Sequence, residues 1–281
     1  MKLDIGKNAM EKQIKLSGIK QQHANKNSLD FYKEQFERKG YVILKNIFDR
    51  DWISKLQNAY DKAIEKNKDF YVNQEIEMSK KEQGIIRQIY RYDDIFLQTI
   101  LKKEISEIAD CFIDDDWIIT QQNGSHIDYK NLNNDTIGVQ VWHRDFVFRH
   151  ITTSKPLLIN MLIPLDSFTK ENGATNVLPY SHLFPEFPSN EFLAENLVHA
   201  ESEPGDVIVL NGLTYHAGGQ NTAGTNRRSF NTVFGVPAMR HQVEPFPENM
   251  SEDFIEKYKK CLTGGYTNNP SVLEYIKERN S

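Results

Sequence analysis

Residues 139–146 read VQVWHRDF, a half-apolar run typical of a β-strand that carries a histidine and an aspartate two positions apart. Side chains alternate between the faces of a strand, so His143 and Asp145 are predicted to point the same way and Arg144 the opposite way. A histidine and a carboxylate that converge in this manner form a hydrogen-bonded pair, a catalytic dyad or part of a metal site. The rest of the sequence has to decide between these three interpretations.

Composition limits the range of functions. The chain has 281 residues, enough for a sizeable core, and its net charge of −5 gives no reason to expect nucleic acid as a partner. Cys111 and Cys261 lie far apart without CxxC spacing, which predicts neither a disulfide framework nor a zinc site. We find neither an apolar run long enough for a membrane span nor the apolar stretch of a signal peptide, and therefore expect a cytoplasmic protein.

The spacing of apolar residues changes along the chain. Helical spacing dominates residues 1–115, whereas short β-like runs separated by Gly, Pro, Asn and Asp occupy 116–240, which is typical of a sandwich, jelly roll or barrel. Helical patterns return in 241–281. Because no linker-like composition divides these parts, we expect a single domain, 1–281, with a helical N-terminal part, a jelly-roll core and a helical tail.

A second histidine stands out in the segment GDVIVLNGLTYHAGGQN. His216 follows a predicted core strand and precedes the glycine pair Gly218 and Gly219, which leaves backbone room around it. Two histidines and one carboxylate on one face of a metal leave three positions open, an arrangement that suits non-haem Fe(II) enzymes. Zinc enzymes also use such ligands, so the three residues alone leave the identity of the metal open.

Arg227 follows His216 by eleven residues and stands at the start of a strand predicted in SFNTVF. A guanidinium holds a carboxylate through two parallel hydrogen bonds, which lysine cannot do. A metal site with a nearby arginine is therefore what a dicarboxylate co-substrate needs. The alternative is that Arg227 and Arg228 are solvated charges at a strand edge.

Four segments in this order, WHRDF, ENGATNVLPYSH, GDVIVLNGLTYHAGGQN and RRSF, resemble the phytanoyl-CoA dioxygenase family, which includes ectoine hydroxylases. The N-terminal stretch FERKGYVILKNIFDRDWISKLQNAYD is also similar to that family, and the likeness runs from about Phe31 to about Pro237. The resemblance implies a mainly β fold with a helical N-terminal layer, namely a double-stranded β-helix (a cupin-like jelly roll). It also implies Fe(II), with 2-oxoglutarate and O2 as co-substrates.

The resemblance further assigns roles to individual residues. It makes His143, Asp145 and His216 the iron ligands, and Arg227 the partner of the distal carboxylate of 2-oxoglutarate. Arg228 takes that role if the strand register differs by one residue. Related halogenases replace the acidic ligand with a small residue to make room for chloride, so the presence of Asp145 favours hydroxylation.

Further residues are candidates for contacts with the co-substrate or substrate. Asn160, the one amide within LLINMLIPL, is either a satisfied core amide or a contact to 2-oxoglutarate. Gln121 and Gln122 alternate across a strand, so only one of them faces inward, and we select Gln121 as a co-substrate contact. We expect the substrate to be bordered by Gln140, Phe146 and Arg149. Arg149 suits an anionic substrate or is a surface charge.

We therefore predict an Fe(II)- and 2-oxoglutarate-dependent dioxygenase that hydroxylates an unactivated C–H bond of a small metabolite, with release of succinate and CO2. Two alternatives stay open. One is a catalytically silent jelly-roll protein that binds a small molecule, although such a protein has no use for three ligands and Arg227. The other is a cupin-like zinc or manganese enzyme.

Overall fold

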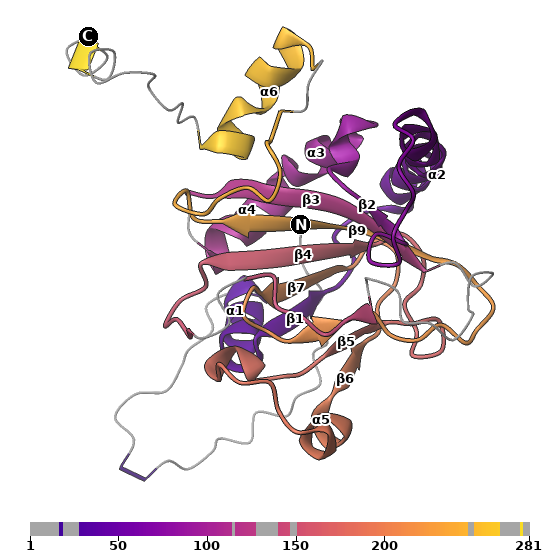
Figure 1. The fold of residues 1–281 in the computed structure, drawn as a ribbon. Coiled ribbons are helices and arrows are strands. Elements are labelled where there is room, and N and C mark those ends of the chain that lie inside the picture. Colours follow the sequence, from indigo (N-terminus) through magenta and orange to yellow (C-terminus); the bar gives the residue numbers. More distant parts are fainter. Residues whose placement is uncertain are drawn as a thin grey trace.

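The computed structural model describes residues 17–18, 28–113, 116–127, 140–146, 151–246, 250–264 and 276–277. Two antiparallel sheets form the centre of the fold, with several helices above the larger one (Figure 1). The larger sheet has the strand order β1 (Tyr41–Leu44), β7 (Val207–Asn211), β4 (Leu158–Pro164), β9 (Arg227–Gly235), β3 (Ile118–Ile127) and β2 (Ile85–Ile86). The smaller sheet has the order β6 (Val198–Ala200), β5 (Thr175–Val177) and β8 (His216–Ala217).

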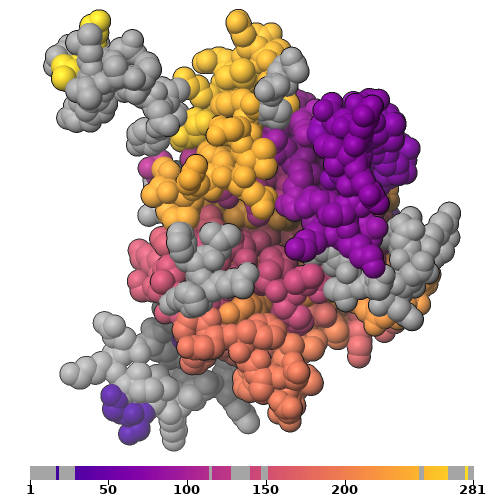
Figure 2. Space-filling model, viewed as in Figure 1, coloured from indigo at the N-terminus to yellow at the C-terminus, as the bar shows by residue number. Residues whose placement is uncertain are grey.

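The α-helices are α1 (Ser28–Lys39), α2 (Arg50–Asn73), α3 (Ile95–Ile100), α4 (Lys103–Phe112), α5 (Asn190–Asn196) and α6 (Glu252–Thr263). Short 3-10 turns cover Ile89–Arg91 and Ser181–Leu183. Helices α2, α3 and α6 lie above the larger sheet, whereas β5, β6 and α5 lie below it (Figure 1). The same division appears in the space-filling view, where the purple α2 and yellow α6 form the upper surface (Figure 2).

Alternation along the strands gives the larger sheet two apolar faces. Its outer face packs against the helices in the main core, to which the strands contribute Leu44, Ile159, Met161, Ile163, Val207, Val209, Phe230 and Phe234. Its inner face packs against the smaller sheet through Leu162, Ile208 and Leu210, which contact Val177 and Ala200. This sandwich of two facing sheets confirms the predicted jelly-roll class.

Side-chain caps define several helix ends. Asp49, Ser189 and Ser251 each accept a hydrogen bond from a backbone N–H in the first turn of α2, α5 and α6, respectively. Helix α6 ends at Gly264, whose φ of 67° is in the left-handed region that glycine adopts without strain. Within the described residues, the helices are all too short or too polar to cross a lipid bilayer.

Some predicted elements differ from the structure. The strand expected over 139–146 is wrong for the part that is described, because residues 140–146 form bends and irregular backbone with a single β-bridge at His143. Near the end of the helical part expected over 1–115, the structure has two short helices, α3 and α4, which are separated at Leu101 and Lys102. Of the helical tail expected over 241–281, α6 is described, whereas residues 265–275 and 278–281 lie outside the described residues.

Candidate metal centre

A backbone bridge places His143 beside His216, although they are 73 residues apart. The N–H of His143 donates to the carbonyl of His216 at 3.0 Å, and the N–H of His216 donates back at the same distance. Strand β8, which begins at His216, pairs in turn with β5 through Val177. The centroids of the two imidazole rings are therefore only 4.3 Å apart.

Asp145 completes a group of three possible metal ligands. Its Oδ1 lies 3.9 Å from Nε2 of His143, and its Oδ2 lies 3.8 Å from Nε2 of His216. One ligand atom from each residue lies within 4.8 Å of the others. The side chains of Asp145 and His216 are only 5% and 7% exposed, whereas that of His143 is 44% exposed. The group is thus held by the protein on one side and open on the other.

The hydrogen bonds of the two imidazoles leave the correct nitrogen free for a metal. Nδ1 of His143 lies 2.7 Å from the carbonyl of Val141, and Nδ1 of His216 lies 3.0 Å from that of Thr214. Because a carbonyl only accepts, each Nδ1 carries the proton and each Nε2 keeps its lone pair. Burial, assisted by the neighbouring His143, holds the pKa of His216 below its ordinary value even though Asp145 opposes the shift. His216 is therefore a neutral imidazole near pH 7, the form that binds metals.

The residues present therefore fit an Fe(II) ion. They supply two imidazole nitrogens and one carboxylate on one side, which is the facial ligand set that leaves positions open for co-substrates. Backbone bonds fix both imidazoles in the tautomer that coordinates. No other group of three or more potential ligands was found in the part of the chain that the structure describes.

Asn160 contacts the carboxylate of this group. It lies in the middle of β4 on the inner face of the larger sheet, and its Nδ2 donates to Oδ2 of Asp145 at 2.9 Å. The Asn160 side chain is buried, and its carbonyl oxygen has no partner among the described residues. The amide that stood out in an apolar strand is thus directly connected to the candidate ligand set.

Arg227 lies in the interior, at the start of β9. It is only 2% exposed, and its guanidinium carbon lies 3.9 Å from the centre of the Phe168 ring. One terminal nitrogen donates to the hydroxyl of Thr175 at 3.0 Å, while the buried Nε has no partner among the described residues. Burial lowers the pKa of Arg227 to about 10, so the group stays charged near pH 7. Among the described residues, no carboxylate forms an ion pair with this cation.

Arg228 faces the opposite way. Its guanidinium forms ion pairs with Asp166 at 2.8 Å and with Asp61 of α2 at 2.6 Å. Hydrogen bonding to Asp166 is the main cause that raises the pKa of Arg228. Its charge is therefore already neutralised by carboxylates of the protein, in contrast to the charge of Arg227.

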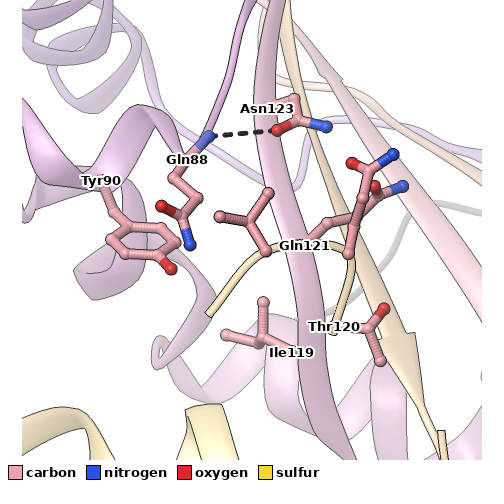
Figure 3. Close-up of a pocket in the computed structure, with 8 residues that line it drawn as sticks. Gln88, Tyr90, Ile119, Thr120, Gln121 and Asn123 are labelled. Atoms are coloured by element: carbon pink, nitrogen blue, oxygen red, sulfur yellow. Dashed lines mark hydrogen bonds between the residues drawn. The ribbon is translucent and has the colours of Figure 1, made fainter. Parts of the chain in front are cut away.

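Gln121 faces inward, as expected, and Gln122 faces outward. Gln121 pairs with Val233, which lies on the inner face beside Asn160. Gln122 donates instead to the carbonyl of Phe96 and to the hydroxyl of Thr232 on the helical side. Gln121 also lines a narrow pocket with Gln88, Tyr90 and Asn123, in which the N–H of Gln88 donates to the side chain of Asn123 (Figure 3). This pocket of about 10 Å³ has room for a water molecule at most and is not lined by any of the three candidate ligands.

The candidates for substrate contact have different surroundings. Gln140 donates to the carbonyl of Gly219 at 3.1 Å, close in sequence to His216. Phe146 is buried against Leu158 and Leu213. Arg149 lies outside the described residues.

Arg144 has a structural role that sequence reasoning did not anticipate. As predicted from alternation, it points away from His143 and Asp145, but it is buried rather than solvated. It donates to the carbonyl of Ser181 at 2.7 Å and to that of Phe184, and its guanidinium carbon lies 4.0 Å from the centre of the Tyr215 ring. Arg144 thus ties the ligand-bearing segment to the turn at 181–185.

Comparison with known proteins agrees with this geometry. The family model described as "Phytanoyl-CoA dioxygenase (PhyH)" matches residues 36–229, which is more than half of the chain. The chain belongs to the phytanoyl-CoA dioxygenase family. This membership makes it an iron- and 2-oxoglutarate-dependent dioxygenase by class, with Fe(II), 2-oxoglutarate and O2 as the corresponding cofactor and co-substrates.

The individual relatives have low sequence identity to this chain. The uncharacterized protein Rv1501 of Mycobacterium tuberculosis is 24% identical, over 78% of this chain and 80% of its own length. The iron/alpha-ketoglutarate-dependent dioxygenase penM of Penicillium thymicola is 28% identical, over 75% of this chain and 68% of its own length. The crystal structure of EctD from S. alaskensis with bound Fe has a TM-score of 0.55 at 20% identity, over 75% of this chain and 77% of that one. At this identity, the structural likeness shows the fold alone.

Proposed function

We propose that this dioxygenase hydroxylates a C–H bond of a small metabolite, with 2-oxoglutarate converted to succinate and CO2. The observation that carries the proposal is the convergence of His143, Asp145 and His216, with both Nε2 atoms free and directed to one place. In this account the three residues hold Fe(II). Bound Fe(II) would supply the activation of O2, and 2-oxoglutarate would provide two of the electrons that the reduction of O2 requires.

Arg227 holds the distal carboxylate of 2-oxoglutarate in this proposal. Two properties support the assignment: the guanidinium is buried and forms no ion pair with a carboxylate of the described residues, and its Nε has no partner among them either. A bidentate arginine–carboxylate pair would satisfy both the charge and the nitrogen. Arg228 is not needed for this role, since Asp61 and Asp166 already pair with it.

The substrate approaches from the side on which His143 is exposed, because the other two ligands are covered by protein. Gln140, Phe146 and Arg149 are the residues that we propose to border it, since they flank the His143–Asp145 segment in sequence. The presence of an acidic ligand at Asp145 favours hydroxylation over halogen transfer. Gln121 lies on the same inner face as Asn160 and is kept as a proposed co-substrate contact.

The experiment is the conversion of 2-oxoglutarate by the purified protein after anaerobic loading with Fe(II). We expect succinate to form when O2 is admitted. Without substrate the conversion of 2-oxoglutarate should be slow, and the correct compound in a metabolite panel should accelerate it. His216→Ala is the control and should form no succinate. The proposed function is wrong if the protein converts a metabolite with Zn(II) or Mn(II) in the absence of O2. It is also wrong if a metabolite binds but succinate never forms.

A further inference from the structure

The two oxygens of Asp145 have different surroundings, and this difference has a cause in β4. Oδ2 accepts a hydrogen bond from Asn160, whereas Oδ1 accepts none from the described residues. We propose that Asn160 is a positioning residue that makes Asp145 a single-oxygen metal ligand by holding Oδ2 and leaving Oδ1 for the ion. The inference rests on the proposed function, because it presupposes that Asp145 binds a metal.

Asn160 is held firmly in the sheet and can therefore fix the orientation of the Asp145 carboxylate. Its strand is central in the six-stranded sheet, and Asn160 itself is paired with Leu210 on one side and with Val233 on the other. The residue is only 4% exposed. Asp145, in contrast, lies in an irregular segment whose one bridge is at His143. The rotation of its carboxylate therefore has to be set by a contact from outside that segment, and Asn160 is the described residue that provides one.

Holding one oxygen matters for the chemistry of a facial site. Aspartate binds metals through one oxygen or through both, and the second mode occupies an additional coordination position. A dioxygenase needs its three open positions for 2-oxoglutarate and O2. An amide N–H on Oδ2 engages that oxygen in a hydrogen bond and fixes the plane of the carboxylate, as partners of metal-binding carboxylates generally do.

The composition of β4 supports a positional role for the amide. The neighbouring inner-face positions of the same strand carry Leu158 and Leu162, so the other positions on this part of the face are apolar. Asparagine leaves its carbonyl oxygen buried without a described partner, which is unfavourable for folding. The bond to Asp145 gives a reason for an amide at this position that packing alone does not give.

The chain offers a matched control in Gln122. This residue is also a buried amide in the larger sheet, its nitrogen donates hydrogen bonds and its carbonyl oxygen lacks a described partner. It faces the helices, however, and contacts none of the three ligands. Asn160→Leu and Gln122→Leu therefore remove equivalent amides, of which only one touches Asp145.

The test is anaerobic titration of each variant with Fe(II) and with Mn(II), together with thermal unfolding of the metal-free proteins. We expect Asn160→Leu to weaken metal binding about 10- to 100-fold. It should also weaken the visible charge-transfer band that forms when 2-oxoglutarate chelates the bound Fe(II). Gln122→Leu should lower the melting temperature of the metal-free protein but leave the metal affinity unchanged. If Asn160→Leu does not fold, Asn160→Ser, whose shorter side chain lacks the amide N–H, takes its place.

The outcomes separate this inference from the proposed function. A wild-type protein that binds neither Fe(II) nor Mn(II) would contradict the metal site itself. A wild-type protein that binds metal, with an Asn160 variant of equal affinity and an equal charge-transfer band, would contradict only the role of Asn160. Equal losses of metal affinity in the Asn160 and Gln122 variants would also overturn it, because the effect would then be one of general stability.

Discussion

Replacement of Arg227 by methionine tests the co-substrate site most sharply, because this cation is buried and, among the residues that the structure describes, pairs with no carboxylate. Methionine removes the guanidinium and keeps much of the apolar volume over the Phe168 ring. Loss of a buried, charge-assisted bidentate contact costs about 2–4 kcal/mol of binding free energy. At about 1.4 kcal/mol per factor of ten, 2-oxoglutarate should bind about 30- to 700-fold more weakly.

The same replacement should not lower the free energy of unfolding of the ligand-free protein, although it weakens the binding of 2-oxoglutarate. A buried charge without a counter-charge is unfavourable, so its removal offsets the lost hydrogen bond to Thr175. The free energy of unfolding of ligand-free Arg227→Met should therefore equal or exceed that of the wild type. In the wild type, 2-oxoglutarate at about 100 times its dissociation constant should add about 2.7 kcal/mol to that free energy, an increment that the variant should lose.

The assay is anaerobic calorimetry of 2-oxoglutarate with the Fe(II)-loaded protein, with Arg228→Met as the control. Arg228 lies on the opposite face and pairs with Asp61 and Asp166, so its loss should cost some stability and leave the affinity for 2-oxoglutarate unchanged. The reasoning is refuted if Arg227→Met binds 2-oxoglutarate as tightly as the wild type, or if Arg228→Met loses as much affinity.

Three other replacements give distinct readouts. His216→Ala should lose Fe(II) binding in an anaerobic titration, since it removes a covered ligand; wild-type affinity would contradict the ligand assignment. Burial holds the pKa of His182 below its ordinary value, so the unfolded chain takes up a proton that the folded protein does not, and stability should fall as the pH drops below about 6.5. Urea unfolding at about pH 7.5 and about pH 5.5 should show a smaller fall in His182→Met, and an equal fall would exclude His182 as the cause. Gly219→Ala would place a Cβ 2.5 Å from the carbonyl oxygen of Ala174. We therefore expect the free energy of unfolding to fall by about 1–3 kcal/mol, measured by thermal unfolding. An unchanged melting temperature would show that the backbone around Gly219 can shift to accommodate the methyl group.

Much of the fold was accessible from local patterns. The run SFNTVF predicted a strand that begins near Arg227, and β9 covers Arg227–Gly235. The helical spacing of residues 1–115 predicted helices in that part, and α2 spans Arg50–Asn73 within it. Both predictions succeed because alternation and helical spacing report which side of an element is buried, and burial is what stabilises these elements.

The ligand-bearing segment shows where such patterns fail. VQVWHRDF alternates like a strand, yet its described residues, 140–146, form a single β-bridge, at His143, and Asp145 lies in a bend. Its relative orientations were nevertheless right, since Arg144 points away from the other two side chains. Strand pairing depends on a partner that is distant in sequence, and no periodicity within the segment reveals that His216 pairs with it at one residue.

Long-range contacts of the site were equally hidden. The alternation of Gln121 and Gln122 predicted that one faces inward, and the register of β3 with β9 identifies it as Gln121. Asn160 stood out as an amide in an apolar strand, but its partner Asp145 emerges only when β4 and the 140–146 segment are assembled. The different fates of Arg227 and Arg228 likewise depend on Asp61 of α2 and on Asp166, whose positions are set by tertiary packing.

A crystal structure of the protein prepared anaerobically with Fe(II) and 2-oxoglutarate, with the iron located by its anomalous scattering, tests the central claim most directly. We predict one iron bound by Nε2 of His143, Nε2 of His216 and a single oxygen of Asp145, with 2-oxoglutarate bound between the iron and Arg227. Iron bound elsewhere, or an anomalous map without a peak among these three side chains, would contradict the account.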